Sequence, residues 1–214
     1  MVDTTIGASH PPEMTTPRTV FLALVCCIAC SGEQSRRDAT QPAGSQTLRV
    51  VAIPNERLIS ESGIGPVRLG VSLDSARSMH PGLVFSRTSD GEGVALVQVV
   101  SGPDTLIAYL GEEDPSAPVN SSQVVRSVET FSPNFLTEQG IHAGSLVTDA
   151  ENAYGRTKEI SKSEIESREF ITFADQPAKL DFRLDSGAGV FDPDSTMTTR
   201  TVPGARIFSI SVRE

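Results

Sequence analysis

The most regular pattern of apolar and polar residues lies near the C-terminal end of the chain, from Arg206 to Arg213. Three apolar side chains alternate there with mostly polar ones: Phe208, Ile210 and Val212 against Ile207, Ser209, Ser211 and Arg213. A period of two places successive side chains on opposite faces of a strand. The pattern therefore predicts a strand in a sheet that has one buried face and one face toward water.

Five further runs rich in apolar and β-branched residues predict strands. Together with the C-terminal run they form two groups of three: Val94–Val100, Thr105–Leu110 and Gln123–Thr130, then Ile165–Phe173, Lys179–Leu184 and Arg206–Arg213. Thr47–Ile53 is a candidate for one more strand at the front. Short turns such as residues 101–104, with the sequence Ser-Gly-Pro-Asp, favour antiparallel hairpins.

A short helical segment precedes each group of strands. Its inward positions recur at i, i+3 and i+7: Leu73, Ala76 and His80 after Gly70, and Val147, Ala150 and Tyr154 after Gly144. This spacing places three side chains on one helix face. Ser72 and Ser145 stand at the two starts, where serine is a good N-cap, and Gly82 and Gly155 end the segments.

Aligning Gly70 with Gly144 matches the two halves of the chain, residues 47–130 and 131–214. Self-similarity at this length indicates duplication of one supersecondary unit. The identities are few, so a chance similarity is the alternative. The predicted fold class is α+β, with two duplicated units, each a short helix packed on a three- or four-stranded antiparallel sheet.

The glycine, the helix and the three strands resemble two known families. One is the small outer-membrane assembly lipoproteins of the SmpA/OmlA type. The other is the β-lactamase-inhibitory protein, whose tandem helix-plus-sheet units form one concave sheet. The resemblance covers the plan of residues 63–214 and implies only the fold, because no functional residue of either family can be carried over.

A run of ten apolar residues, Val20–Ala29, follows Arg18 near the N-terminus. Crossing a membrane takes about 20 residues, whereas the apolar segment of a secretory signal has about 7–15. Residues 1–13 contain Asp3 and Glu13 and no Lys or Arg, although a signal begins with a basic region. We therefore assign residues 1–29 to a signal peptide and expect translation to start at Met14.

All three cysteines, Cys26, Cys27 and Cys30, lie at the end of this run. Ala29 before Cys30 resembles the cleavage site of bacterial lipoproteins, which implies that Cys30 becomes the lipidated first residue of the mature chain. Cleavage before Cys27 is one alternative, and an ordinary signal with incidental cysteines is another. Cys30 is preferred because polar residues follow it directly, and residues 30–46 are predicted to be the lipidated cysteine and a flexible tether.

Composition excludes several classes of function. The 214 residues include 18 Lys plus Arg and 27 Asp plus Glu, for a formal net charge of −9, which disfavours nucleic acid as a partner. With three His and three Cys, we expect no metal and no cofactor. His80 and His142 are interpreted as structural, and no catalytic residue is predicted because the nucleophile motif G-x-S-x-G is absent.

The connection Asp185–Gly204 has 20 residues, whereas its counterpart in the first half, Gly111–Ser122, has 12. Loops beyond about 12–15 residues tend to be functional or disordered. Val190, Phe191 and Met197 lie in it among polar residues and are our candidate binding residues, since a partner would cover their apolar surface. The alternatives are a loop without a role and a loop folded back over the sheet.

Together these features predict an exported, lipid-anchored, non-enzymatic cell-envelope protein that acts as a periplasmic binding or assembly module. Ser31 lacks the Asp that lipoproteins associate with inner-membrane retention, so the resemblance implies the outer membrane of a Gram-negative cell, facing the periplasm. The expected partners are the membrane, through the N-terminal lipid, and an envelope protein. The alternative is a periplasmic enzyme, or an enzyme inhibitor that uses loops at the sheet edge.

Lipidation at Cys30 is testable by metabolic labelling with a fatty-acid analogue. We expect label on the wild type and on Cys27→Ser, and none on Cys30→Ser, because only the thiol at the mature N-terminus accepts the lipid. Label that persists in Cys30→Ser and disappears in Cys27→Ser would move the cleavage site.

Overall fold

The computed structural model describes residues 52–111, 114–164 and 166–214, which fall in one compact unit. Met14, the three cysteines, the tether and Ile165 lie outside the described residues, as do residues 47–51 of the candidate first strand. Ala52 and Ile53 are not in a strand; the first regular element is a 3-10 helix, η1 (Asn55–Arg57). Within the described ranges, no helix has the length and apolar character needed to cross a membrane.

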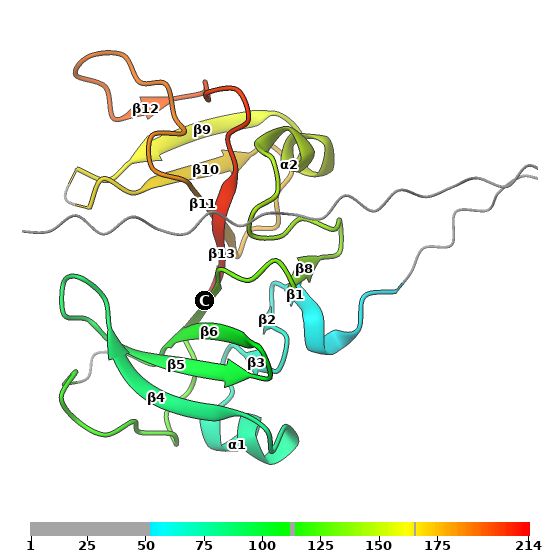
Figure 1. Cartoon of the computed structure of the whole chain (residues 1–214), viewed down its shortest axis with the longest axis vertical. Coiled ribbons are helices and arrows are strands. Elements are labelled where there is room, and N and C mark those ends of the chain that lie inside the picture. The colour runs from blue at the N-terminus through cyan, green and yellow to red at the C-terminus, as the bar shows by residue number, and fades with distance from the viewer. Residues whose placement is uncertain (1–51, 112–113, 165) are drawn as a thin grey trace, which may run out of the picture. The chain divides into compact units, whose positions relative to one another are not determined.

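The larger of two sheets contains nine strands among the described residues (Figure 1). Their spatial order is β12 (Met197–Thr198), β9 (Thr157–Lys162), β10 (Glu169–Phe173), β11 (Leu180–Leu184), β13 (Ile207–Arg213), β7 (Ser127–Thr130), β6 (Asp104–Tyr109), β5 (Ala95–Ser101) and β4 (Val84–Ser89). Every neighbouring pair is antiparallel. Two antiparallel meanders, one from each half of the chain, thus meet at β13 and β7.

A smaller, four-stranded sheet lies beside the larger one. Its order is β3 (Val67–Arg68), β2 (Gly63–Ile64), β1 (Leu58–Ser60) and β8 (Leu136–Thr137). The pairing of β1 with β8 is parallel, which the expectation of purely antiparallel sheets did not include. The two strands are distant in sequence and belong to different halves, so no tight turn constrains their direction. The structure is α+β, with far more strand than helix.

Both helices were predicted, and their inward faces are confirmed. Helices α1 (Leu73–Met79) and α2 (Val147–Tyr154) bury the alanines Ala76 and Ala150 against the core. Figure 1 shows α1 beside the first meander and α2 beside the second. His80, predicted to face the core, is the C-cap of α1 and is only half-buried.

The two helix starts differ in their caps. The Ser72 hydroxyl accepts a hydrogen bond from the Ser75 N–H at 3.2 Å, as expected for an N-cap. Ser145 does not cap α2, whose N-cap is Leu146 without a side-chain bond. Its hydroxyl instead accepts the His142 N–H at 3.0 Å, because the preceding turn places that donor within reach.

Gly70 and Gly144 nevertheless make the same pair of backbone hydrogen bonds. The Gly70 N–H donates to the carbonyl of Val125, two residues before β7, at 2.8 Å, and the Gly144 N–H donates to the carbonyl of Ile207, the first residue of β13, at 2.7 Å. In return, the N–H of Val125 or Ile207 donates to the carbonyl of the residue after the glycine, at 3.0 and 2.9 Å. Each glycine also has a positive φ, 71° and 95°.

Four predicted strands have nearly the expected bounds, and two are shorter. Gln123–Thr130 is a strand only as β7, and of Ile165–Phe173 only β10 is a strand. Strands β4 and β9 were not predicted, nor were the short strand β12 and the strands of the small sheet. In β4 no residue is fully buried and in β9 only Ile160 is, so neither has the apolar alternation that marks a strand.

A β-bulge reverses part of the pattern predicted for β13. Leu184 pairs with Ile207 and Arg183 with Ser209, so Phe208 is an extra residue in the ladder. Ile207 is therefore buried, whereas Phe208 is 41% exposed. The expected order, with Phe208 inward and Ile207 outward, was wrong at these two positions.

The core is one cluster that includes both helices and both meanders. Its largest side chains lie in the second half, where Tyr154, Phe173 and Phe182 contact each other with ring centroids 5.5–6.3 Å apart. Rings at these distances add to the free energy gained from burial alone. These rings come from α2, β10 and β11, so their contacts hold α2 against the second-half strands of the large sheet.

Alanine substitutions at glycines test the two turns. A Cβ at Gly70 or Gly144 meets nothing within 4 Å, so only the positive φ opposes it. We expect each substitution to lower the free energy of unfolding by about 1–2 kcal/mol, and by similar amounts. Gly63→Ala should cost clearly more, because its Cβ would collide with the Val67 carbonyl oxygen. Urea unfolding measures all three.

Gly82→Ala is the control for these variants, since Gly82 has open space and no positive φ. It should unfold like the wild type. A loss at Gly63 no larger than at Gly70 would contradict the packing described for β2 and β3.

Candidate functional site

The two faces of the nine-stranded sheet differ in character. One packs on the helices and the core; we call the other the outward face. A hollow of about 520 Å³ lies on it and takes side chains from both halves of the chain. Apolar groups from β5 and β6 and charged or aromatic groups from β10, β11 and β13 line it: Leu96, Ile107, Tyr109, Phe170, Arg183 and Arg213.

Strand register explains why these side chains meet. Across the pairing of β7 with β13, Glu129 lies opposite Ser211, and Ser211 in turn lies opposite Asp181 on β11. Directly paired residues point to the same face, so these three form one polar row. The next row contains Ser209, Arg183 and Phe170, also in direct register.

The charged groups of the first row are bonded within the chain. Arg213 holds Asp181 with two contacts, Nε to Oδ2 at 2.6 Å and Nη2 to Oδ1 at 3.0 Å. Burial raises the pKa of the Asp181 carboxyl above its ordinary value, and the neighbouring Arg213 acts in the opposite direction. The Ser209 hydroxyl donates to Glu129 at 2.5 Å.

An aromatic group lies next to this row. The rings of Phe131 and Phe208 meet edge to face with centroids 5.4 Å apart, and each residue is 41% exposed. The Cζ atom of Arg183 lies 4.8 Å from the Phe208 centroid, close enough for a cation–π contact. Phe170, paired with Arg183, is 38% exposed. We call Phe131, Phe170, Phe208 and Arg183 the aromatic–arginine patch.

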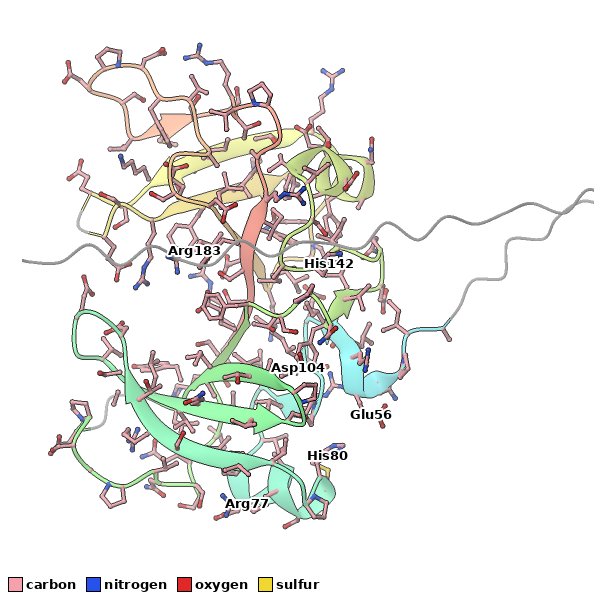
Figure 2. The ribbon with its side chains drawn as sticks, in the orientation of Figure 1. Glu56, Arg77, His80, Asp104, His142 and Arg183 are labelled. Carbon is pink, nitrogen blue, oxygen red and sulfur yellow. The ribbon has the colours of Figure 1, made fainter. Side chains whose placement is uncertain are left out.

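Arg183 differs from the other arginines of the hollow in its bonding. Arg213 is paired with Asp181, and Arg168 is paired with Glu166 at 2.8 Å. The Nε atom of Arg183 is buried and has no acceptor among the described residues. In Figure 2, Arg183 and His142 lie on opposite sides of β13, so the histidine is not part of this patch.

Three carboxylates gather at the tips of two hairpins. Asp90 and Glu92, between β4 and β5, and Glu166, between β9 and β10, have oxygens within 4.8 Å of one another. Groups of the chain itself stabilise part of this negative charge. Asp90 accepts hydrogen bonds from the N–H groups of Glu92 and Val94, and Glu166 forms an ion pair with Arg168. Exposed acidic groups of this kind are common without a metal, and we assign none here.

The predicted binding residues of the connection Asp185–Gly204 differ in exposure. Met197 is 55% exposed, and its strand β12 pairs with β9, which places Met197 opposite Ser161 on the outward face. Val190 is at the border of exposure. Phe191 packs against the core, as the folded-back alternative describes. A contact role for this loop stays a prediction.

Buried Glu169 explains why the connection lies where it does. Its carboxylate is 2% exposed and accepts the N–H groups of Gly187 at 3.0 Å and Gly189 at 2.6 Å. These bonds fix the first turn of the connection against β10. These bonds were not predicted, because a charged residue within a strand run is expected to face outward.

The histidines lie away from the outward face. His80 lines a hollow of about 120 Å³ with Glu56 and Arg68, near η1. The Nδ1 atom of His142 lies 2.8 Å from the Ala143 carbonyl oxygen. Another hollow, of about 360 Å³, lies by the small sheet, but Gln139 in it already accepts the Tyr154 hydroxyl and Glu61 accepts the Lys179 N–H.

Comparison with known proteins does not assign a function. No known protein family matches the chain, and no curated protein matches it. Among solved structures, the chain is similar to the uncharacterized protein YfeY from Escherichia coli, with 11% identity and a TM-score of 0.48. The similarity covers 73% of this chain and 99% of that one.

Glu169→Gln tests the anchoring of the connection. Glutamine keeps one acceptor oxygen and turns an N–H₂ group toward a backbone N–H, so one donor loses its partner. We expect a loss of about 1–3 kcal/mol in the free energy of unfolding. Glu164→Gln, at an exposed position, is the matched control and should have no effect. Equal stability of the two variants would show that the connection is held in another way.

Proposed function

We propose that this protein is an exported, lipid-anchored, non-enzymatic envelope protein that binds another envelope protein through the outward face of its nine-stranded sheet. The N-terminal signal and Cys30 support export and anchoring. The observation that carries the binding role is the aromatic–arginine patch. Phe131, Phe170 and Arg183 line one hollow, and the exposed ring of Phe208 lies beside it, in contact with Phe131 and Arg183.

The composition of the patch favours a protein as the partner. Aromatic residues and arginine are enriched at the centres of protein interfaces and dominate their binding energy. Ion pairs lie around the patch, as at an interface rim: Arg213 with Asp181 and Arg168 with Glu166. The contact between Phe131 and Phe208 covers only part of each ring. A partner protein would cover the apolar area that is still exposed to water.

The arrangement gives less support to the alternative of an enzyme or a loop-inserting inhibitor. The carboxylates of the hollow that would serve as acid or base are held by the chain's own donors, as for Asp181 and Glu129. Phe170 and Phe208 of the patch are on strands of the face, whereas an inhibitor of the expected kind would carry its apolar groups on loops at the sheet edge.

We also propose that the two halves are copies of one unit. The shared hydrogen bonds of Gly70 and Gly144 and the order of one helix followed by four meander strands support this. Clearly unequal costs of Gly70→Ala and Gly144→Ala would count against it. The outward face would then have arisen by joining the last meander strands of the two copies.

Cross-linking in the native envelope, followed by recovery of the protein with its partner, tests the binding role. We expect Phe131→Ser and Phe208→Ser to reduce recovery of the main partner by roughly tenfold, since an interface aromatic of this kind contributes about 1–2 kcal/mol. Met79→Ser is the matched control, because Met79 is 58% exposed at the end of α1 and outside the patch. Unchanged recovery by folded patch variants would reject the outward face as the contact.

A further inference from the structure

We propose that Arg183 is the specificity-determining residue of the patch and that it receives a carboxylate side chain of the partner protein. This inference rests on the proposed function and adds the chemistry of the contact. It starts from the difference among the three arginines of the hollow, two of which already hold a carboxylate of their own chain.

The side chain of Arg183 is held in place but not satisfied. Its guanidinium stacks on Phe208, and its side chain makes no hydrogen bond or ion pair with any residue in the described ranges. A guanidinium is always charged and presents five donors in a planar fork. The contact with Phe208 restricts the side chain before a ligand arrives, so less side-chain freedom is lost on binding.

The surroundings favour a singly charged, planar acceptor. Two oxygens of a carboxylate match the guanidinium fork, and apolar neighbours such as Phe170 and Phe208 strengthen the charge interaction. Glu129 and Asp181 lie on the same face, one row away. Their negative charge repels a phosphate dianion more strongly than a singly charged carboxylate. Among the described residues, Arg183 is the one arginine lining the hollow that has no carboxylate partner, so it supplies a single positive charge for the ligand.

The extent of the patch favours a protein over a free small carboxylate. Small ligands are usually enclosed on most of their surface. Phe208, which stacks on Arg183, is 41% exposed and does not line the hollow, so the apolar surface continues past it. A partner that places an acidic side chain on Arg183 and apolar side chains over Phe131 and Phe208 covers this whole surface.

The first arm of the test uses sodium benzoate as the probe, on the full-length lipidated protein in detergent. The NMR signal of the Arg183 Nε–H, assigned with Arg183→Lys, should shift on titration with benzoate. Benzamide, which has the same ring and no charge, should not shift it, and inorganic phosphate at equal ionic strength should bind more weakly. Arg183→Lys removes this signal, so benzoate binding by the variant and by the wild type is compared through the backbone amide signal of Phe208. Binding by the variant should be about tenfold weaker, because lysine keeps the charge but lacks the fork.

The second arm repeats the envelope cross-linking with Arg183→Lys. Partner recovery should fall as it does for Phe208→Ser, whereas Arg156→Lys, at an exposed arginine in the turn before β9, should recover the partner normally. Thermal melting confirms that each variant is folded.

The outcomes separate the two proposals. Equal responses to benzoate and benzamide overturn the carboxylate site. A benzoate response that depends on Arg183, together with normal partner recovery by Arg183→Lys, also overturns it, since the carboxylate would then come from a free small molecule. In either case a loss of recovery by Phe131→Ser and Phe208→Ser leaves the proposed function intact, and normal recovery by those variants rejects that function instead.

Discussion

The antiparallel pairing of β7 with β13 is the constraint on which the rest of the sheet depends. Val128 lies opposite Val212, and both are completely buried. A slip of one residue would turn Glu129 into the core and a valine toward water. Since the hydrophobic cost of that exchange is large, the register is fixed, and with it the identity of every side chain that the two central strands present on the outward face.

The bulge in β13 determines where the aromatic surface lies. Without the extra residue, Phe208 would point to the core side, as the alternation in the sequence suggests. With it, Ile207 fills the core and Phe208 stacks between Phe131 and Arg183. Bulges often redirect a side chain at a functional position. Here the redirected side chain is the one that links Phe131, directly after β7, to Arg183 on β11.

The sequence predicted elements whose signal is local and missed features that depend on distant partners. Both helices follow from the spacing of residues such as Ala76 and Ala150, which are buried as expected. Strand β9 was missed because its side chains are mostly polar and Ile160 alone is fully buried. The patch could not be predicted by the same reasoning. The exposure of Phe208 depends on a bulge opposite β11. The lack of a carboxylate partner at Arg183 depends on Arg213, distant in sequence, forming the ion pair with Asp181.

Joining the two meanders removes two exposed sheet edges and creates the outward face at their junction. Taken separately, β7 and β13 would each be an edge strand with unpaired backbone groups, which invites uncontrolled association. Their pairing removes both edges and brings Glu129 of β7 and Phe131, which directly follows β7, next to Ser209 and Phe208 of β13. The outward face at this junction therefore exists only in the joined sheet. A binding surface made in this way requires both halves to be folded, so the surface and the stability of the sheet depend on the same strand pairing.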